Sequence, residues 1–189
     1  MRWLCWRVAT LMGWSFRGEV PPLPKMVVVG APHTSNWDFF LFLAALHAYR
    51  IEVRFLAKHT LFRPPLGFLF RAVGGIPVDR SRPGGIVGQV MEVFAATDRM
   101  ILVIAPEGTR NNAPRWKTGF LEIAERAGVP VVPASIDAGT KTITIGPPLE
   151  LGRDRSRLMD RLRSFYQGKT GVRPRLQGPV RLIGEGDRS

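Results

Sequence analysis

The stretch MVVVGAPHTSNWD, residues 26–38, joins a short apolar run to a polar turn that carries a histidine and a carboxylate. An apolar run of this length is typical of a buried β-strand. Five positions separate His33 from Asp38, and on one continuous helix two such side chains would point in different directions. The two groups can therefore meet only if His33 lies in the turn before a helix that contains Asp38.

The residues after His33 indicate where that helix begins. Ser35 is a good N-cap, and Asp38 follows three positions later, as in a capping box. The helix dipole favours an ionised Asp38 in the first turn. A histidine accepts a proton from a hydroxyl near neutral pH, while a carboxylate holds its ring in the right tautomer. The alternative is a plain capping box with an incidental histidine, and this stretch alone leaves both interpretations open.

The chemistry that this pattern favours needs neither a covalent enzyme intermediate nor a metal. No serine or cysteine nearby sits in a nucleophile elbow, so we expect direct base catalysis on a substrate hydroxyl. Cys5 is the single cysteine, which excludes a disulfide framework and a cysteine-based metal site. His33, His47 and His59 are not at zinc-site spacings, and we expect no bound cofactor or metal.

The chain is strongly basic, with a formal net charge of +12 over 189 residues. Only five of its 27 basic residues are lysines, and they are scattered rather than clustered. Such a charge favours anionic partners, which include nucleic acid, anionic lipid and phosphorylated substrates. A solvated cationic surface without a specific partner explains much of the same excess.

The N-terminal residues 1–20 interleave tryptophans and aliphatic residues with arginines. This pattern is typical of a short helix lying in a membrane interface, and the alternative is a helix packed on the core. We find no signal peptide cleavage site. The longest apolar stretch, residues 39–48, is about half the ~20 residues that a membrane-spanning helix needs. We therefore expect a peripheral protein at the cytoplasmic face of the cell membrane, without a transmembrane helix.

The rest of the chain alternates strand-like and helix-like runs, which predicts a single-domain α/β sandwich with a mostly parallel sheet flanked by helices. The predicted divisions are the N-terminal segment 1–20, a domain over residues 21–170 and a tail over 171–189. Strands are predicted at residues 26–31, 53–57, 76–78, 101–105, 131–136 and 142–145. Helices are predicted at residues 35–49, 65–72, 84–96, 116–127 and 154–167.

Polar residues follow four of these strands. His33 comes after the first, Lys58 after the second, Asp79 and Arg80 after the third, and the turn PEGTR, residues 106–110, after the fourth. If the strands are parallel, all four groups lie at one carboxyl edge of the sheet, where open α/β sheets bind their ligands.

The PEGTR turn has its own chemistry, because backbone N–H groups beside Gly108, the Thr109 hydroxyl and the Arg110 guanidinium are suited to binding phosphate. Glu107 is expected to position Arg110 or to accept a hydrogen bond from a substrate hydroxyl. A polar turn with a local Glu107–Arg110 pair is the plainer alternative.

Four motifs together resemble a known family. HTSNWD at residues 33–38 is similar to the H-x4-D motif of the glycerolipid acyltransferases, the lysophosphatidic acid acyltransferase family. GGIPVDR at 74–80 resembles the family's second block, APEGTR at 105–110 its third, and VPVVPA at 129–134 its fourth. Ala57-Lys58 resembles the lysine after the second strand that contacts phosphate. The chain departs from the family at Pro32, commonly asparagine, and at Ala105, commonly aromatic.

The resemblance implies an acyltransferase for groups other than aminoacyl groups, resembling 1-acylglycerol-3-phosphate O-acyltransferases. The donor would be acyl-CoA or acyl-carrier protein, and the acceptor a lysophospholipid at an anionic membrane surface. His33 would be the general base and Asp38 its orienting partner. The expected substrate-binding residues are Lys58, Arg80, Glu107, Gly108, Thr109 and Arg110. Residues 39–46 and 61–70 would line an acyl groove, although core packing accounts for most of them.

Three other functions stay open on the sequence. A basic nucleic-acid-binding domain would explain the charge, but the chain lacks aromatic-basic signatures and any binding motif, so no nucleic acid is expected. A membrane-surface lipid-binding protein without catalysis is the second. The third is a hydrolase in which His33 and Asp38 activate water.

Overall fold

The structure is a computed structural model that describes residues 1–65, 67–79, 85–152 and 154–183. In these residues seven strands form one sheet in the order β1-β7-β6-β2-β5-β3-β4. The strands are β1 (Ser15–Arg17), β2 (Lys25–Gly30), β3 (Arg54–Lys58), β4 (Gly75–Val78), β5 (Met100–Ile104), β6 (Val131–Asp137) and β7 (Thr142–Ile145). The helices are α1 (Arg2–Leu11), α2 (Trp37–Ala48), α3 (Gly67–Ala72), α4 (Gly85–Ala95), α5 (Gly119–Ala127) and α6 (Arg155–Tyr166), with short 3-10 turns at His59–Phe62 and Pro174–Leu176.

The sheet is mostly parallel, as predicted. Strands β6, β2, β5, β3 and β4 run in one direction, and β7 pairs antiparallel with β6. β1 pairs parallel with β7 over Ser15–Arg17 and extends that edge of the sheet. The sequence did not predict β1, because a strand of three residues is too short for apolar alternation to be recognised. All six predicted strands and all five predicted helices are present, with ends that differ by a few residues.

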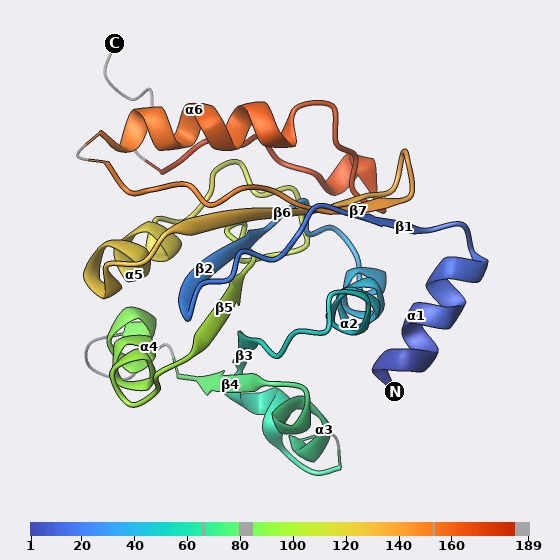
Figure 1. Ribbon diagram of the computed structural model, residues 1–189, viewed down its shortest axis with the longest axis horizontal. Coiled ribbons are helices and arrows are strands. Elements are labelled where there is room, and N and C mark those ends of the chain that lie inside the picture. The colour runs from blue at the N-terminus through green and yellow to red at the C-terminus, as the bar shows by residue number, and fades with distance from the viewer. Residues whose placement is uncertain (66, 80–84, 153, 184–189) are drawn as a thin grey trace.

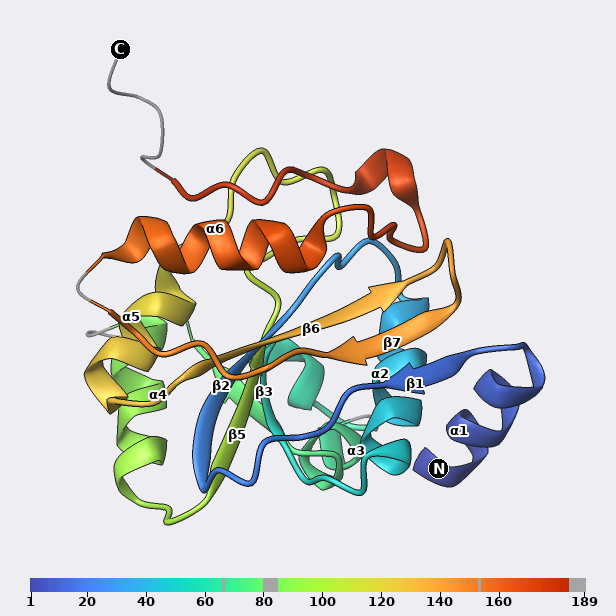
Figure 2. The ribbon, with the colours of Figure 1, turned by 45° about the horizontal axis from the view of Figure 1, so that its top comes forward.

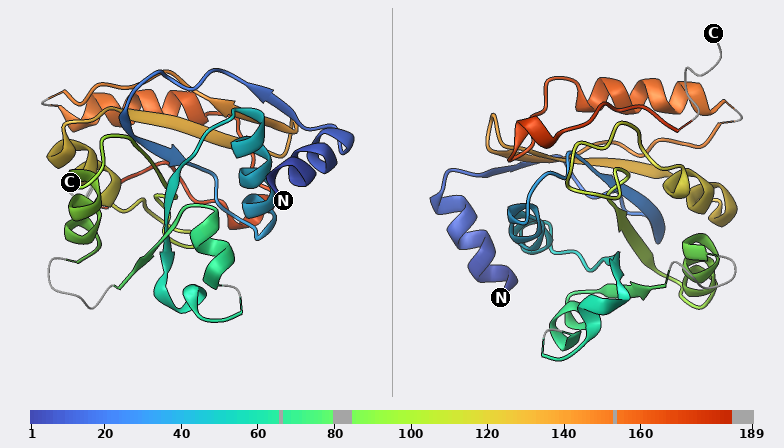
Figure 3. Two further views of the ribbon diagram at one scale, coloured as in Figure 1. Left: turned by 60° about the horizontal axis from the view of Figure 1, so that its bottom comes forward. Right: turned by 180° about the vertical axis from the view of Figure 1, so that it is seen from behind.

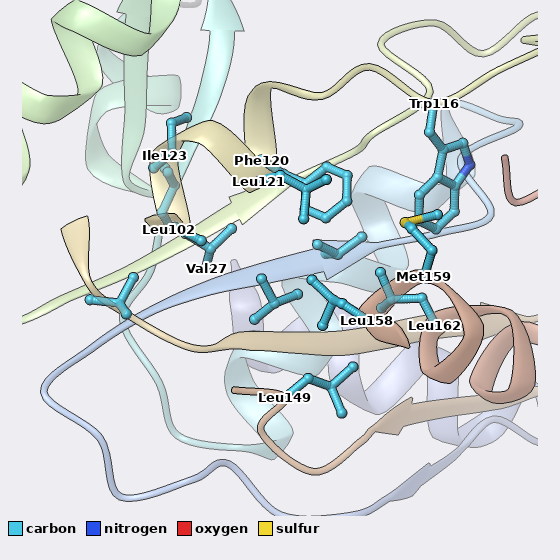
Figure 4. Packing of buried hydrophobic residues seen from close by; sticks show 14 of the residues in the cluster. Val27, Leu102, Trp116, Phe120, Leu121, Ile123, Leu149, Leu158, Met159 and Leu162 are labelled. Carbon is cyan, nitrogen blue, oxygen red and sulfur yellow. The ribbon is translucent and has the colours of Figure 1, made fainter. Parts of the chain in front are cut away.

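Helices cover both faces of the sheet, with α5 and α6 on one side and α1 and α2 on the other (Figure 1). The face under α4, α5 and α6 holds the larger core, in which Val27, Leu102 and Phe120 are almost fully buried. Figure 4 shows Val27 and Leu102 of the sheet among the side chains of α5 and α6. Tyr166 of α6 also donates a hydrogen bond to the Val29 carbonyl (2.6 Å), which ties α6 to the end of β2.

Helix α1 packs on α2 with one face and exposes the other. Cys5 and Ala9 are buried, and the Trp6 ring lies 5.3 Å from the His47 ring. Burial raises the pKa of the Cys5 thiol. Trp3 and Leu11 are 56% and 82% exposed. The helix therefore packs on the core and still presents an apolar face.

Among the described helices, none is both long and apolar enough to cross a bilayer.

The described part of the C-terminal tail lies against the domain. Leu182 is buried in the larger core and bridges to Trp116, while Gly178 lies directly against the Ala113 backbone. Figure 3 shows the tail beside the loop that follows β5. The tail therefore reaches the edge of the sheet where the polar motifs lie.

The seam between β5 and β3 is short. β3 pairs with β5 only at Arg54↔Leu102 and Phe55↔Val103, whereas β2 pairs with β5 over five residues. Beyond Phe55 the β3–β4 pair therefore separates from β5. This separation leaves space at the carboxyl ends of the strands.

Candidate active site

His33 and Asp38 form a pair at the carboxyl end of β2. His33 Nδ1 lies 3.1 Å from Asp38 Oδ2, and the imidazole is 26% exposed while the carboxylate is 3% exposed. When Nδ1–H donates to the carboxylate, Nε2 is left as the ring's proton acceptor. Because His33 lines a cavity, that nitrogen is available to a bound molecule.

Asp38 also shapes the loop that carries the histidine. Its Oδ2 accepts hydrogen bonds from the backbone N–H groups of Thr34 (2.7 Å) and Ser35 (2.8 Å). A single buried oxygen thus holds both the loop and the imidazole, so the ring orientation is fixed by the fold.

Helix α2 is regular from Trp37, with Asn36 at its N-terminal boundary. Asn36 already has helical angles (φ −67°, ψ −23°) and its side chain makes no capping bond, so the capping contacts come from Ser35, as predicted. The hydrogen bonds expected of a capping box are made. Ser35 Oγ accepts from Trp37 N (3.2 Å), and Asp38 reaches back to Ser35 N. The same carboxylate therefore serves both the helix start and the histidine.

Glu107 supports the histidine from the turn that follows the neighbouring strand β5. Its Oε1 accepts a hydrogen bond from the His33 backbone N–H at 2.9 Å. The side chain is 7% exposed, and burial raises the pKa of its carboxyl above the ordinary value. Oε2 has no hydrogen-bond partner among the described residues. Within the described residues, the Glu107 carboxylate therefore binds the backbone of the His33 loop and forms no ion pair with Arg110.

The rest of the PEGTR turn faces the cavity. Gly108, Thr109 and Arg110 line it, and Thr109 Oγ1 accepts from Asn111 N (3.2 Å). Gly108 has φ +65°, and a side chain there would meet Lys117 Cε at 2.9 Å. The positive φ favours glycine at this position, and a larger side chain would also displace the end of the Lys117 side chain.

Four basic residues line the cavity: Lys58, Arg110, Lys117 and Arg173. Within the described ranges none of the four forms a salt bridge. Cations without carboxylate partners around one cavity make a site that attracts anions. Arg80, predicted from the second block, lies outside the described residues.

Sequence reasoning missed two of these cations. Lys117 lies seven residues beyond Arg110, and no motif marks it. Arg173 lies in the tail over residues 171–189, which the sequence predicts to be separate from the domain. Only the packing of the tail on the carboxyl edge brings Arg173 to the cavity, and local sequence carries no signal for that packing.

The cavity has a volume of about 850 Å³ and an apolar interior. Side chains of β2 and β5 that point away from the larger core line it, among them Val28 and Val103. Phe39 and Phe42 of α2 face it from the other side. Leu61 and Phe70, from the second predicted groove segment, line it as well. The space suits an apolar chain whose polar end lies beside His33.

The described residues offer no group of three or more His, Cys, Asp or Glu side chains placed to hold a metal ion. The chemistry that these residues can supply is proton transfer at His33, anion binding at the rim and accommodation of an apolar chain inside.

Comparison with known proteins finds matches among acyltransferases. The family model described as acyltransferase matches residues 16–137, which include the His33–Asp38 loop, Lys58 and the PEGTR turn. The 1-acyl-sn-glycerol-3-phosphate acyltransferases of Limnanthes alba and Limnanthes douglasii are each 33% identical over 116 residues, which is 58% of this chain and 40% of theirs. The chloroplastic BAT2 acyltransferase of Brassica napus is 29% identical over 119 residues, 60% of this chain and 35% of that protein. The chain thus aligns with well under half the length of these curated relatives.

A solved acyltransferase structure has a similar fold. The 1-acyl-sn-glycerophosphate acyltransferase PlsC from Thermotoga maritima superposes with a TM-score of 0.60 over 87% of this chain and 74% of that chain, at 21% sequence identity. At this identity the likeness concerns the architecture of sheet and helices.

Proposed function

This chain belongs to the acyltransferase family, and we propose that it transfers a fatty acyl group from an acyl thioester to a hydroxyl of a lysophospholipid such as 1-acylglycerol 3-phosphate. The observation that carries the proposal is the His33–Asp38 pair at 3.1 Å, facing a cavity with a basic rim and an apolar interior. Acyl-CoA and acyl-carrier protein are the two donor classes.

In the proposed reaction His33 Nε2 accepts the proton of the acceptor hydroxyl as its oxygen attacks the thioester carbonyl. The new C–O bond forms, the C–S bond breaks, and the proton passes from His33 to the leaving thiolate. Asp38 stabilises the imidazolium that forms between these steps. A positioned general base contributes about 10²–10⁴-fold in rate, and binding of both substrates in the right orientation supplies much of the rest.

The other parts of the site have matching roles in the proposal. Lys58 and Arg110 bind the acceptor phosphate with the Gly108–Thr109 backbone, because charged donors suit phosphate oxygens. Glu107 acts indirectly, through its hydrogen bond to His33 N. The interior lined by Val28, Val103 and Phe42 takes the acyl chain.

We also propose contact with a membrane surface through α1. Trp3, Leu4 and Leu11 are more than half exposed, and Arg2 and Arg7 lie on the same helix. Tryptophan and arginine favour the headgroup level, so this helix suits the surface of an anionic bilayer. The substrate is itself a lipid, and docking there would bring it near the cavity.

The experiment is incubation of the purified chain with isotopically labelled acyl-CoA, or acyl-carrier protein, and a panel of lysophospholipids, followed by mass spectrometry. A labelled diacyl product that depends on His33 supports the proposal. Labelled free fatty acid without an acylated acceptor would replace it with hydrolysis. Absence of any acylated product with both donors and every acceptor would overturn it.

A further inference from the structure

The segment after α6 returns to the carboxyl edge of the sheet and is held there by several hydrogen bonds. We call residues 169–177 the strap. Thr170 N donates to Asp137 Oδ1 (3.0 Å), and Ala138 N donates to the Thr170 carbonyl (2.7 Å). Within the strap, Gly171 N donates to Gln177 Oε1 (2.8 Å), and Gln177 Nε2 donates to the Lys169 carbonyl (2.9 Å). The strap is therefore fixed to the end of β6 and braced internally.

The strap lies directly on the loop that carries His33. Arg173 N donates to Thr34 Oγ1 (3.0 Å), and Thr34 is the residue next to the histidine. A Cβ added to Gly171 would lie 2.7 Å from Thr34 Oγ1 and 2.8 Å from Thr34 Cγ2. Figure 2 shows the strap beside the connection between β2 and α2. The position of Arg173 is thus coupled to the histidine loop itself.

Arg173 carries an exposed, unpaired charge into the rim of the cavity. It lines the cavity together with Leu176, and it forms no salt bridge within the described part of the chain. Arg175, two residues later, is also exposed but lies outside the lining. The strap therefore presents one of its two arginines to the site.

The strap that carries Arg173 is anchored at β6, on the side of His33 away from the strands that precede Arg110 and Lys58. In the sheet order β6-β2-β5-β3, the strap is fixed at β6, His33 follows β2, Arg110 follows β5 and Lys58 follows β3. The histidine thus has basic residues on both flanks. Both proposed substrates carry phosphate, so anionic groups lie around His33 during the reaction. If cations lay on only one side of His33, a phosphate on the other side would have no basic partner.

We propose that Arg173 is a substrate-binding residue that holds a phosphate group from the β6 side of His33. The inference rests on the proposed acyl transfer. Guanidinium binds phosphate through two parallel hydrogen bonds, and the backbone bond to Thr34 fixes the strap from which the side chain extends. The phosphate belongs either to the lysophospholipid acceptor or to the phosphopantetheine-bearing donor, and kinetics separate the two.

The test is steady-state kinetics of Arg173→Ala, with both substrates varied. One hydrogen-bonded charge pair corresponds to about 10–100-fold in affinity, so the KM of one phosphate-bearing substrate should rise by that factor while kcat changes little. A raised acceptor KM assigns the phosphate to the lysophospholipid, and a raised donor KM assigns it to the thioester carrier. Arg173→Lys should recover part of the loss, because it keeps the charge without the planar fork.

Arg175→Ala is the matched control, since it removes the same charge from the same strap outside the cavity. Equal KM values in the wild type, Arg173→Ala and Arg175→Ala would overturn the inference. An equal rise in both variants would also overturn it, because the effect would then be one of net charge. Thermal unfolding followed by circular dichroism checks that each variant keeps the fold.

A binding measurement separates this inference from the proposed function. Calorimetric titration with coenzyme A and with 1-acylglycerol 3-phosphate needs no turnover. If the wild-type chain transfers no acyl group, acyl transfer fails as the function, and a weaker affinity of Arg173→Ala for either ligand still supports anion binding at Arg173. Unchanged affinity for both ligands in that variant would overturn the inference whether or not the enzyme turns over.

Discussion

The two faces of β2 differ in what covers them. Val27 and Val29 point into the larger core beneath α5 and α6 and are fully buried there. Met26 and Val28, the alternate residues of the same strand, line the cavity on the side of α2. One strand thus supplies a filled core with one set of side chains and a binding cavity with the other. Stability and function therefore depend on adjacent residues of one strand. Substitutions at these residues should separate an effect on stability from an effect on function.

The largest expected effect is on catalysis alone. His33→Ala should lower kcat by about 10²–10⁴-fold, since it removes the general base. The free energy of unfolding should change little, because the imidazole is partly exposed and its backbone contacts remain. Product formation by mass spectrometry and urea denaturation measure the two quantities. Retained activity in the purified variant would refute the assignment of the base.

The second-largest effect is expected for Arg110→Ala, which should weaken binding of the acceptor. Loss of one charged contact to phosphate should raise the acceptor KM by about 10–100-fold, with a small change in kcat and in stability. The side chain is exposed at the cavity rim and forms no salt bridge in the described residues, so the fold does not depend on it. An unchanged acceptor KM would count against the phosphate role.

The adjacent valines give the most direct contrast between the two faces. Val27→Ala removes two methyl groups from a filled core, which should destabilise the chain by about 2–3 kcal/mol. Val28→Ala enlarges a space that is already open, and should cost less than about 1 kcal/mol. The second variant should instead shift the preference among acyl chain lengths. Equal losses of stability in the two variants would show that both faces are equally packed.

Glu107 should give the smallest effect, visible in the pH dependence of stability. Burial raises the pKa of Glu107 above its ordinary value of 4.5, so the unfolded chain loses this proton at a lower pH than the folded chain. As the pH rises from about 4.5 to the raised pKa, this group therefore makes the folded state progressively less stable. Above the raised pKa its contribution is constant.

Glu107→Gln keeps an oxygen for the His33 N–H and removes the titration. The free energy of unfolding of the variant should rise relative to wild type across that pH window, by at most about 1.4 kcal/mol per pH unit for a single proton. Denaturation curves at several pH values measure the difference. A parallel pH dependence in both proteins would show that this carboxyl does not titrate differently on folding.

Much of the fold and part of the site followed from local sequence. The apolar runs predicted the strands, and the parallel sheet follows from their alternation with helices. The parallel order then brought His33, Lys58 and the PEGTR turn to one edge, and the family assignment from the motifs is confirmed. The roles of the individual residues stay predictions, and so do the domain boundaries at residues 20 and 170.

Contacts between segments that are distant in the chain could not be predicted from the sequence. Glu107 binds the backbone of His33, a residue 74 positions away, and a local pattern gives no sign of that partner. Arg173 reaches the cavity only because Asp137 and Thr34 hold the strap. The short strand β1 depends on its pairing with β7 rather than on its own residues.

Gly171 shows how strictly such contacts restrict variation. Its backbone lies outside the left-handed region, so conformation alone would permit any amino acid there. The crowding against Thr34 instead excludes even a methyl group. In a saturation mutagenesis library this position should tolerate as few replacements as the histidine itself, although it has no side chain and takes part in no chemical step.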